Sequence, residues 1–283
     1  MGADFVLLIA CEDRKGIVAA VANSIASQDC NIVESSQYGD KNTGRFFMRV
    51  ALSCTANTTS ESFSAAFMSV AAAFQLDWQI HDLRKKLRAM IMVSQGGHCL
   101  NDLLYRTSTS RLPMDVTSIV SNHVNWQRRA EHEGIPFHHL PITPETKLDQ
   151  EAKLLAMVEE QQVDLIILAR YMQVLDEELC RNFAGKIINI HHSFLPSFAG
   201  AKPYHQAHRR GVKLIGATCH FVTPDLDEGP IVEQDVIRID HSDTPEDMAH
   251  LGKDIEKVVL ARGLRAVVED RVLLAGNKTV IFR

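Results

Sequence analysis

The chain has 283 residues, enough for one large domain or two of ordinary size, and its 46% hydrophobic content is that of a globular protein. Its formal net charge of −5 leaves no broad basic field for nucleic acid or an anionic membrane. The sequence has no apolar run near the ~18 residues of a membrane span and no basic leader typical of a signal peptide. We therefore expect a cytoplasmic protein, with its 6 cysteines reduced and mostly buried because they form no CxxC pair.

Residues 1–84 predict a compact unit with the element order βαββαβ. Apolar or alternating runs predict strands at 5–11, 31–40, 45–53 and 76–83. Apolar residues at helical spacing predict helices at 15–28 and 60–74, the second capped by Ser60. The turn that carries Asp13, Arg14 and Gly16 is either a simple helix cap or part of a ligand site, and the residues alone leave both interpretations open.

A basic segment at 85–88 predicts a linker to a second domain at 89–283, in which strand and helix patterns alternate. Strands are expected at 89–94, 115–122, 135–141, 163–170 and 186–190. Helices are expected between them at 99–107, 126–134, 147–161 and 176–185. This order predicts an α/β, Rossmann-like domain with a mostly parallel sheet. It is followed by an antiparallel pair, 213–222 and 230–239, and a long helix at 244–270.

Polar side chains gather at the end of one predicted strand, where IINIHH carries Asn189, His191 and His192. Open parallel sheets bind ligands outside the carboxyl ends of their strands, so we expect segments 168–175 and 222–230 to meet there. An amide and a protonated imidazole can stabilise an oxyanion, and the Asp227 carboxylate can orient water or carry a proton. The chain lacks a GxSxG elbow, which favours direct attack by water or an amine.

Simpler interpretations exist for each of these residues. A histidine after a strand is often only a hydrogen-bonded loop residue, and an aspartate in DEG is usually part of a turn. Histidines at 191, 192, 205, 208 and 220 raise the question of a metal site. No HExxH motif or Cys/His ligand spacing accompanies them, so no metal is predicted.

Three segments, taken in order, resemble the formyltetrahydrofolate-dependent formyltransferase fold over about residues 89–283. LARYMQVL is similar to its pterin loop, NIHHSFLPSF to its Asn-x-His strand end and Ser-x-Leu-Pro loop, and GATCHFVTPDLDEGPIVEQ to its segment with a catalytic Asp. The resemblance implies that Asn189, His191 and Asp227 are catalytic. It implies substrate contacts from Met172, Gln173, Val174, Leu175, His192, Val222, Thr223 and Asp225, with His220 supporting them.

Within this fold the doubled histidine and the RGVKLIGAT run most closely resemble the formyltetrahydrofolate deformylases. That resemblance implies hydrolysis of 10-formyltetrahydrofolate to formate and tetrahydrofolate, which supplies formate for purine synthesis and balances the one-carbon folate pool. Formyl transfer to a phosphorylated amine such as glycinamide ribonucleotide needs a phosphate loop beside the first strand. The loop QGGHCLNDLL keeps two glycines but has His98 and Cys99 next, which favours water as the acceptor. Transfer to a small amine and a catalytically silent amino-acid or folate sensor stay open as alternatives.

The N-terminal unit resembles an ACT domain, a ferredoxin-like module. The resemblance implies that Asp13, Arg14 and Gly16 help bind an amino-acid effector, with glycine and methionine as candidates. It also implies a homo-oligomer, a dimer or tetramer, formed through this domain. The folate substrate is the only cofactor-like molecule expected, with no metal, nucleic acid or membrane partner.

Overall fold

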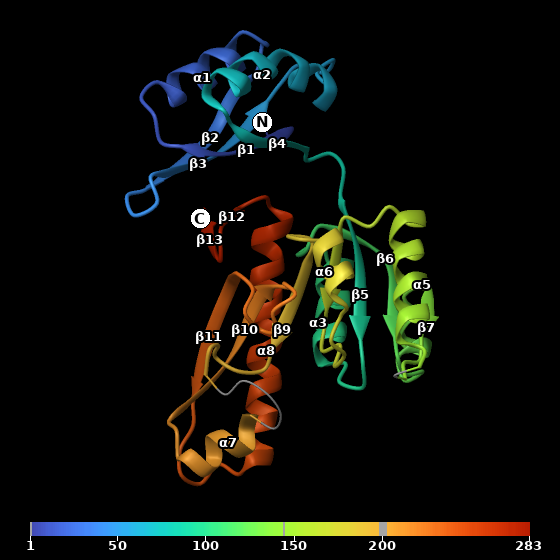
Figure 1. Ribbon diagram of the computed structural model, residues 1–283. Coiled ribbons are helices and arrows are strands. Elements are labelled where there is room, and N and C mark those ends of the chain that lie inside the picture. The colour runs from blue at the N-terminus through green and yellow to red at the C-terminus, as the bar shows by residue number, and fades with distance from the viewer. Residues whose placement is uncertain (1, 144, 198–202) are drawn as a thin grey trace. The chain divides into compact units, whose positions relative to one another are not determined.

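The computed structural model describes residues 2–143, 145–197 and 203–283 (Figure 1). The chain divides into two compact units. The first comprises Met1–Lys86, Glu269–Ala275 and Val280–Arg283, and the second Leu87–Val268 and Gly276–Thr279. The sequence had suggested a single division at 85–88. The structure differs at the C-terminus, because Leu273 and Phe282 pack against Ala10 and Phe47 of the first unit.

The first unit has the predicted βαββαβ order. Its elements are β1 (Phe5–Glu12), α1 (Ile17–Ala26), β2 (Asn31–Asp40), β3 (Arg45–Ser53), α2 (Ser60–Phe74) and β4 (Asp77–Asp82). They form an antiparallel sheet in the order β2-β3-β1-β4. Apolar residues of both helices, such as Val21 and Phe67, are fully buried in one core with Leu7 and Val50 of the sheet. Helical spacing in the sequence therefore identified the core faces of α1 and α2 correctly.

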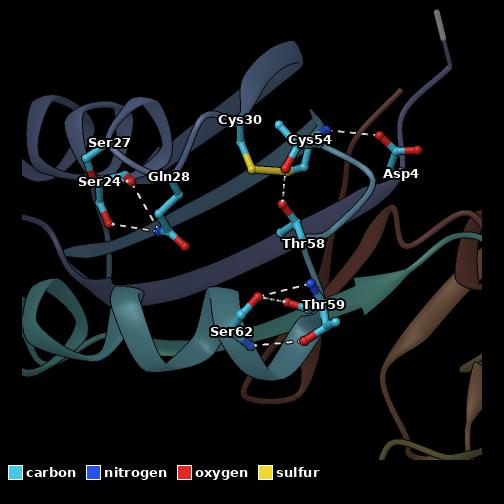
Figure 2. The surroundings of a disulfide bond; sticks show 10 residues. Asp4, Ser24, Ser27, Gln28, Cys30, Cys54, Thr58, Thr59 and Ser62 are labelled. Carbon is cyan, nitrogen blue, oxygen red and sulfur yellow. Dashed lines mark hydrogen bonds between the residues drawn. A yellow bond between two sulfur atoms is a disulfide. The ribbon is translucent and has the colours of Figure 1, made fainter.

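Thr59, and not Ser60, caps α2 (Figure 2). Thr59 is extended and its hydroxyl accepts a hydrogen bond from the Ser62 amide at 3.1 Å, while the Ser62 hydroxyl accepts one from the Thr59 amide at 3.0 Å. This reciprocal pair is a capping box, which satisfies two amides that the first helical turn leaves unpaired. Ser60 is already inside the helix, so the predicted cap was wrong by one residue.

Cys30 and Cys54 form a disulfide, so the expectation that all cysteines are reduced is wrong for this pair (Figure 2). Cys30 directly precedes β2 and Cys54 directly follows β3. The register of these antiparallel strands pairs Asn31 with Ser53, which brings the flanking cysteines together. The spacing of the cysteines in the sequence could not reveal the disulfide, because it depends on the register of β2 and β3. The other four cysteines, Cys11, Cys99, Cys180 and Cys219, are free and buried.

The second unit is built on a seven-stranded sheet with the order β11-β10-β9-β8-β5-β6-β7. The first part of the chain forms β5 (Leu87–Val93), α3 (His98–Ser108), β6 (Met114–Ser121), α4 (Gln127–His132), β7 (Phe137–His139), α5 (Lys147–Glu160), β8 (Leu165–Leu168), α6 (Glu177–Asn182) and β9 (Ile187–His191). The second part forms α7 (Pro203–Arg210), β10 (Leu214–Phe221), β11 (Ile231–Arg238) and α8 (Pro245–Val268). Strands β5 to β9 pair in parallel, whereas β10 and β11 are antiparallel, as predicted.

The strand order changes direction at β5, which lies between β6 and β8. The chain runs outward from β5 through β6 to β7 and then returns to the other side of β5 as β8. Such a switch point leaves a crevice at the carboxyl ends of the strands, where this class of sheet binds ligands. Helices α5 and α6 pack on β5, β6 and β8 through a core that includes Met90 and Leu154, and α8 packs on β10 and β11.

Three elements were missed by the sequence patterns. Helix α7 has a polar sequence, PYHQAHRR, without an apolar stripe. Strands β12 (Val272–Ala275) and β13 (Lys278–Ile281) have only 4 residues each, too few to show a period of two. Strand β5 also begins at Leu87, two residues inside the segment expected to be linker.

Among the described residues, no helix is both long and apolar enough to cross a membrane.

The disulfide gives the first testable prediction. The two cysteines are 24 residues apart, so Cys30→Ser should lower the free energy of unfolding by about 3 kcal/mol, because the cross-link restricts the unfolded chain. Urea denaturation followed by circular dichroism, with and without dithiothreitol, measures this. Reductant should abolish the difference between the variant and the unmodified protein. Cys180→Ser, which removes a free thiol and keeps the disulfide, is the control and should lose stability in reductant to the same extent as the unmodified protein.

Candidate active site

Ser94, just after β5, ties together the loops at the carboxyl ends of three parallel strands. Its hydroxyl donates to Asn122 Oδ1 at 2.8 Å, after β6, and accepts from the Met172 amide at 3.0 Å, after β8. Its carbonyl accepts from Trp126 Nε1 at 2.9 Å. These bonds fix the start of the 172–175 segment, in which Met172 and Val174 remain 57% and 56% exposed and therefore accessible to a ligand.

Asn189 and His220 form a hydrogen-bonded pair across strands β9 and β10, where they are register partners. His220 Nδ1 lies 2.9 Å from the Phe221 carbonyl oxygen, which can only accept, so Nδ1 carries the proton. His220 Nε2 therefore accepts from Asn189 Nδ2 at 3.1 Å. Burial lowers the pKa of His220, in keeping with this neutral form. The pair orients the Asn189 amide and leaves its second N–H for another acceptor.

Asp227 reaches His191 from a loop that folds back along β9. Because β10 runs antiparallel to β9, the loop starts beside the first residue of β9, where the Val222 amide bonds the Ile187 carbonyl at 2.9 Å. This loop turns back sharply. Asp227 has a left-handed φ of 59°, and a Cβ on Gly229 would lie 1.8 Å from the Phe221 oxygen. The sequence predicted that segment 222–230 meets the other segments at the carboxyl ends of the strands, and the fold-back that brings it there is a finding of the structure.

The Asp227 carboxylate is paired with an imidazole. Its Oδ1 lies 3.1 Å from His191 Nδ1 and 3.8 Å from His220 Nε2. The hydrogen bond from His191 holds the pKa of Asp227 below its usual value, although burial opposes the shift. His191 Nε2 is buried and has no hydrogen-bond partner among the described residues. The arrangement therefore presents an ionised carboxylate, an imidazole with a free nitrogen and an amide donor side by side.

His192 stacks on His191, with ring centroids 5.0 Å apart. Burial, aided by the charge of Arg170, lowers the pKa of His192 to about 4. His192 is therefore neutral at physiological pH and can both donate and accept a hydrogen bond.

The remaining predicted residues lie in two loops and in the first unit. Val222 and Leu175 pack against the core cluster that contains Met90, so their side chains support the loops, while Gln173 is partly exposed. Thr223 donates to the Asp225 carbonyl at 3.0 Å, and the Asp225 side chain is exposed. Residues 198–202 of the NIHHSFLPSF motif and its continuation lie outside the described residues.

In the first unit, the predicted effector residues form the turn before α1. Gly16 has φ 94° and is the N-cap of α1, which explains the glycine by backbone conformation alone. Arg14 donates to Glu12 at 2.6 Å and to Gln75 at 3.1 Å. Asp13 is exposed and lies beside Gly39. A Cβ added to Gly39 would lie 3.3 Å from Asp13 Oδ2.

Sequence reasoning missed Ser94, Arg170 and Glu256. Glu256 is 1% exposed and accepts hydrogen bonds from His98 Nε2 at 2.7 Å and the Tyr204 hydroxyl at 2.9 Å. Arg170 Nε lies 3.4 Å from the same carboxylate. A signal was present, because Glu256 falls on the apolar stripe of the long predicted helix. A surface pocket of about 330 Å³, lined by residues 213, 238–241 and 243, contains none of the predicted site residues.

Comparisons with known proteins identify the family of the chain. A family model described as formyl transferase matches residues 87–264. A formyltetrahydrofolate deformylase of Corynebacterium sp. (strain P-1) is 45% identical over 279 residues, 98% of each chain. A solved formyltetrahydrofolate deformylase from Pseudomonas syringae pv. tomato is 49% identical, with a TM-score of 0.97 over 100% of this chain and 95% of that chain. The chain belongs to the formyltetrahydrofolate deformylase family.

A transferase shares the fold over a smaller part of the chain. The structure of glycinamide ribonucleotide transformylase 1 from Symbiobacterium toebii is 30% identical, with a TM-score of 0.66, and covers 70% of this chain and 95% of that one. The predicted family and fold class are therefore confirmed. Membership in the deformylase family rests on relatives that span nearly the whole chain, not only the part shared with transferases.

The His191–Asp227 pair predicts a specific pH dependence of stability. Because the folded-state pKa of Asp227 is lowered from 3.8, its ionisation stabilises the fold above that pH, and this contribution is lost as the pH falls through the folded pKa. The free-energy difference between the unmodified protein and Asp227→Asn should therefore be constant from neutral pH to about pH 5 and change below that. Urea denaturation at a series of pH values measures it. The acid-dependent change should be smaller in a His191→Gln background, and an undiminished change there would contradict the assigned cause.

Proposed function

We propose that this chain hydrolyses 10-formyltetrahydrofolate to formate and tetrahydrofolate. The observation that carries the proposal is the ionised Asp227 carboxylate, 3.1 Å from His191 and 3.8 Å from His220, which binds the Asn189 amide. A carboxylate can take a proton from water, and the amide and imidazole can donate to the oxyanion that forms on the formyl group. The near full-length similarity to deformylases supports water as the attacking group.

In the first step, Asp227 orients a water molecule and accepts its proton while the water oxygen bonds to the formyl carbon. Negative charge then develops on the formyl oxygen. The second N–H of Asn189 Nδ2 can donate to this oxygen, because the first N–H is held by His220. With a proton on each ring nitrogen, His191 donates to Asp227 through Nδ1 and to the oxyanion through the otherwise unpartnered Nε2.

In the second step, the tetrahedral intermediate collapses and the bond from carbon to N10 of the folate breaks. N10 takes up a proton as it leaves, with His191 or a water as the relay. No covalent enzyme intermediate forms. Segments 172–175 and 222–225 would receive the pterin ring largely through their backbone, and neutral His192 would border the bound substrate. We infer that the formate released supplies purine synthesis and that the reaction balances the one-carbon folate pool.

Two alternatives are weaker. Transfer to a small amine would use the same carboxylate, imidazole and amide, but the transformylase relative covers only 70% of this chain. A silent sensor of folate or amino acids would not need Asp227 paired with His191 at 3.1 Å, or His220 placed between Asp227 and the Asn189 amide, as they are here.

We further propose that the first unit is an ACT domain that binds an amino acid and joins subunits into a dimer or tetramer of a cytoplasmic enzyme. Strand β2 supports the oligomer, because it is an outer strand of its sheet and all of its 10 residues are exposed or only partly buried. An unpaired edge of this length is a template for pairing with another chain. The turn at Asp13, Arg14 and Gly16 is the proposed part of the effector site.

The function is tested by incubating the purified protein with 10-formyltetrahydrofolate alone and measuring formate and tetrahydrofolate. We expect stoichiometric formate without any acceptor. Asn189→Ala should reduce kcat by ~10²–10³, because one oxyanion donor is lost, and Asp227→Asn should abolish release above background. Glu228→Gln, an exposed neighbour, is the matched control and should be unaffected. Near-native turnover in Asn189→Ala would refute its role, and tight folate binding without turnover would favour the transferase alternative.

The effector proposal is tested by titrating glycine and methionine while measuring formate release and the thermal midpoint Tm. One of the two should change both quantities in a saturable way, and Arg14→Ala should weaken this response. Lys15→Ala, an exposed cation next to Arg14, should leave the response intact. Unchanged activity and Tm with both amino acids would remove the basis for these effectors.

A further inference from the structure

Glu256 is a buried carboxylate that the proposed mechanism does not use. It lies in the middle of α8, one turn after Gly252, and is 1% exposed. A Cβ on Gly252 would lie 1.9 Å from the Tyr204 hydroxyl, so only glycine lets Tyr204 pass across the helix to reach Glu256 Oε1. His98 and Arg170 approach the other oxygen, Oε2. Helix α3, helix α7 and the loop that carries Arg170 thus each contribute a contact to one carboxylate on α8.

The carboxylate is held in its charged form. Burial acts to raise the pKa of Glu256, but the hydrogen bond from His98 and the positive charge of Arg170 outweigh it, and the pKa lies below its usual value. Because an ionised carboxylate only accepts hydrogen bonds, both His98 Nε2 and the Tyr204 hydroxyl donate to it. Glu256 therefore places a negative charge in the interior and accepts the hydrogen bonds that His98 and Tyr204 can donate.

This charge lies at the start of helix α3. The helix begins at His98, directly after the glycines of the loop that follows the central parallel strand β5. A glycine loop between a parallel strand and a helix N-terminus is a position at which α/β sheets bind phosphate. Here a Cβ on Gly97 would lie 2.1 Å from the Trp126 ring. The indole therefore covers the loop, and the Glu256 carboxylate engages the side chain of His98, the first residue of the helix.

The Glu256 cluster reaches the proposed catalytic residues through two aromatic contacts. Tyr204 lies 6.1 Å from His192, and His192 lies 5.0 Å from His191, between ring centroids. The carboxylate is therefore near enough to govern which molecule can stand beside the formyl group, but it does not contact His191 or Asp227 among the described contacts.

A metal site is the competing interpretation, because ligand atoms of His98, Cys99 and Glu256 lie within 4.8 Å of one another. Both Glu256 oxygens already accept hydrogen bonds, and the Arg170 guanidinium stands next to one of them. Burial also raises the pKa of Cys99 well above its usual value, which disfavours the thiolate that would bind a metal. The cluster is better explained as a carboxylate held by hydrogen bonds from His98 and Tyr204 and by the charge of Arg170.

We propose that Glu256 is a specificity-determining residue, which engages Arg170 and His98, the groups that a phosphorylated formyl acceptor would need, and so leaves water as the acceptor. This inference rests on the proposed hydrolysis, and it assigns to Glu256 the exclusion of a phosphorylated acceptor. A phosphate would have to displace the carboxylate from His98 and Arg170, and while Glu256 remained it would meet a like charge at close range. The transformylase relative, by its name, acts on a ribonucleotide, which carries such a phosphate.

The experiment measures binding of inorganic phosphate by its effect on Tm at constant ionic strength, with formate release recorded in parallel. The unmodified enzyme should show no phosphate-dependent change in Tm. Glu256→Ala removes the carboxylate and frees His98 and Arg170, so its Tm should rise saturably with phosphate, with an apparent affinity at least about 10-fold higher than that of the unmodified enzyme. Glu256→Asp retains the charge and should remain insensitive. Asp254→Asn, an exposed acid on the same helix with a side chain 70% exposed, is the matched control and should also remain insensitive.

Two outcomes would overturn the proposal. One is saturable stabilisation of the unmodified enzyme by phosphate with the same midpoint as Glu256→Ala. The other is a folded Glu256→Ala without any response to phosphate, which would leave Glu256 a structural role only. If Glu256→Ala does not fold, Glu256→Gln decides, since loss of the charge alone should make its Tm rise with phosphate, and a Tm of Glu256→Gln that is insensitive to phosphate would refute the proposal. Tm does not depend on turnover, so failure of hydrolysis in the unmodified enzyme is distinguished from failure of this inference.

Discussion

The antiparallel pairing of β10 with β9 is the constraint on which the site depends. Its register sets His220 opposite Asn189 and Thr218 opposite His191. The Thr218 hydroxyl donates to the Ser193 carbonyl and accepts from the Leu195 amide, which fixes the chain just beyond the two adjacent histidines. Because β10 is antiparallel to β9, the loop after β10 starts beside the first residue of β9, folds back along this strand and delivers Asp227.

Two carboxylates, the partly buried Asp227 and the buried Glu256, are stabilised in the same way, although they have different proposed roles. Each has a pKa below its usual value because a histidine donates to it, and Arg170 adds a positive charge for Glu256. Uncompensated charges of this kind would be costly in the interior, so each group depends on its partners. Between the two clusters lies His192, which burial keeps neutral. A neutral ring between the two anionic centres can bridge them by packing without adding a third charge that needs compensation.

Much of the architecture could be read from the sequence because it depends on local periodicity. The βαββαβ unit, the alternating strands and helices, and the antiparallel pair all have apolar spacing of two or of three to four residues, and each was found. The elements that escaped are either too short or too polar to show a period, such as β12 and α7. The disulfide escaped for another reason, since it follows from the register of β2 and β3 and not from spacing.

The same distinction between local patterns and long-range contacts applies to the site residues. Asn189, His191 and Asp227 could be selected from motif resemblance, and the structure brings them together, although their roles remain predictions. Ser94 and Arg170 could not be selected, because each acts through partners from segments distant in sequence. Glu256 did leave a signal, since a charged residue on the apolar stripe of a long helix must find compensating groups inside the fold. The identity of those groups depends on packing that no short stretch of sequence specifies.

The bond between His98 and Glu256 joins residues 158 positions apart in the chain. During synthesis, β5 and α3 therefore emerge from the ribosome long before the helix that completes their surroundings. Until α8 arrives, the buried face of β10 and the cations near α3 lack their partners, and contacts over such separations form slowly. The second unit is thus exposed to misfolding and aggregation until nearly the whole chain has been translated, which is the period in which a chaperone would matter most.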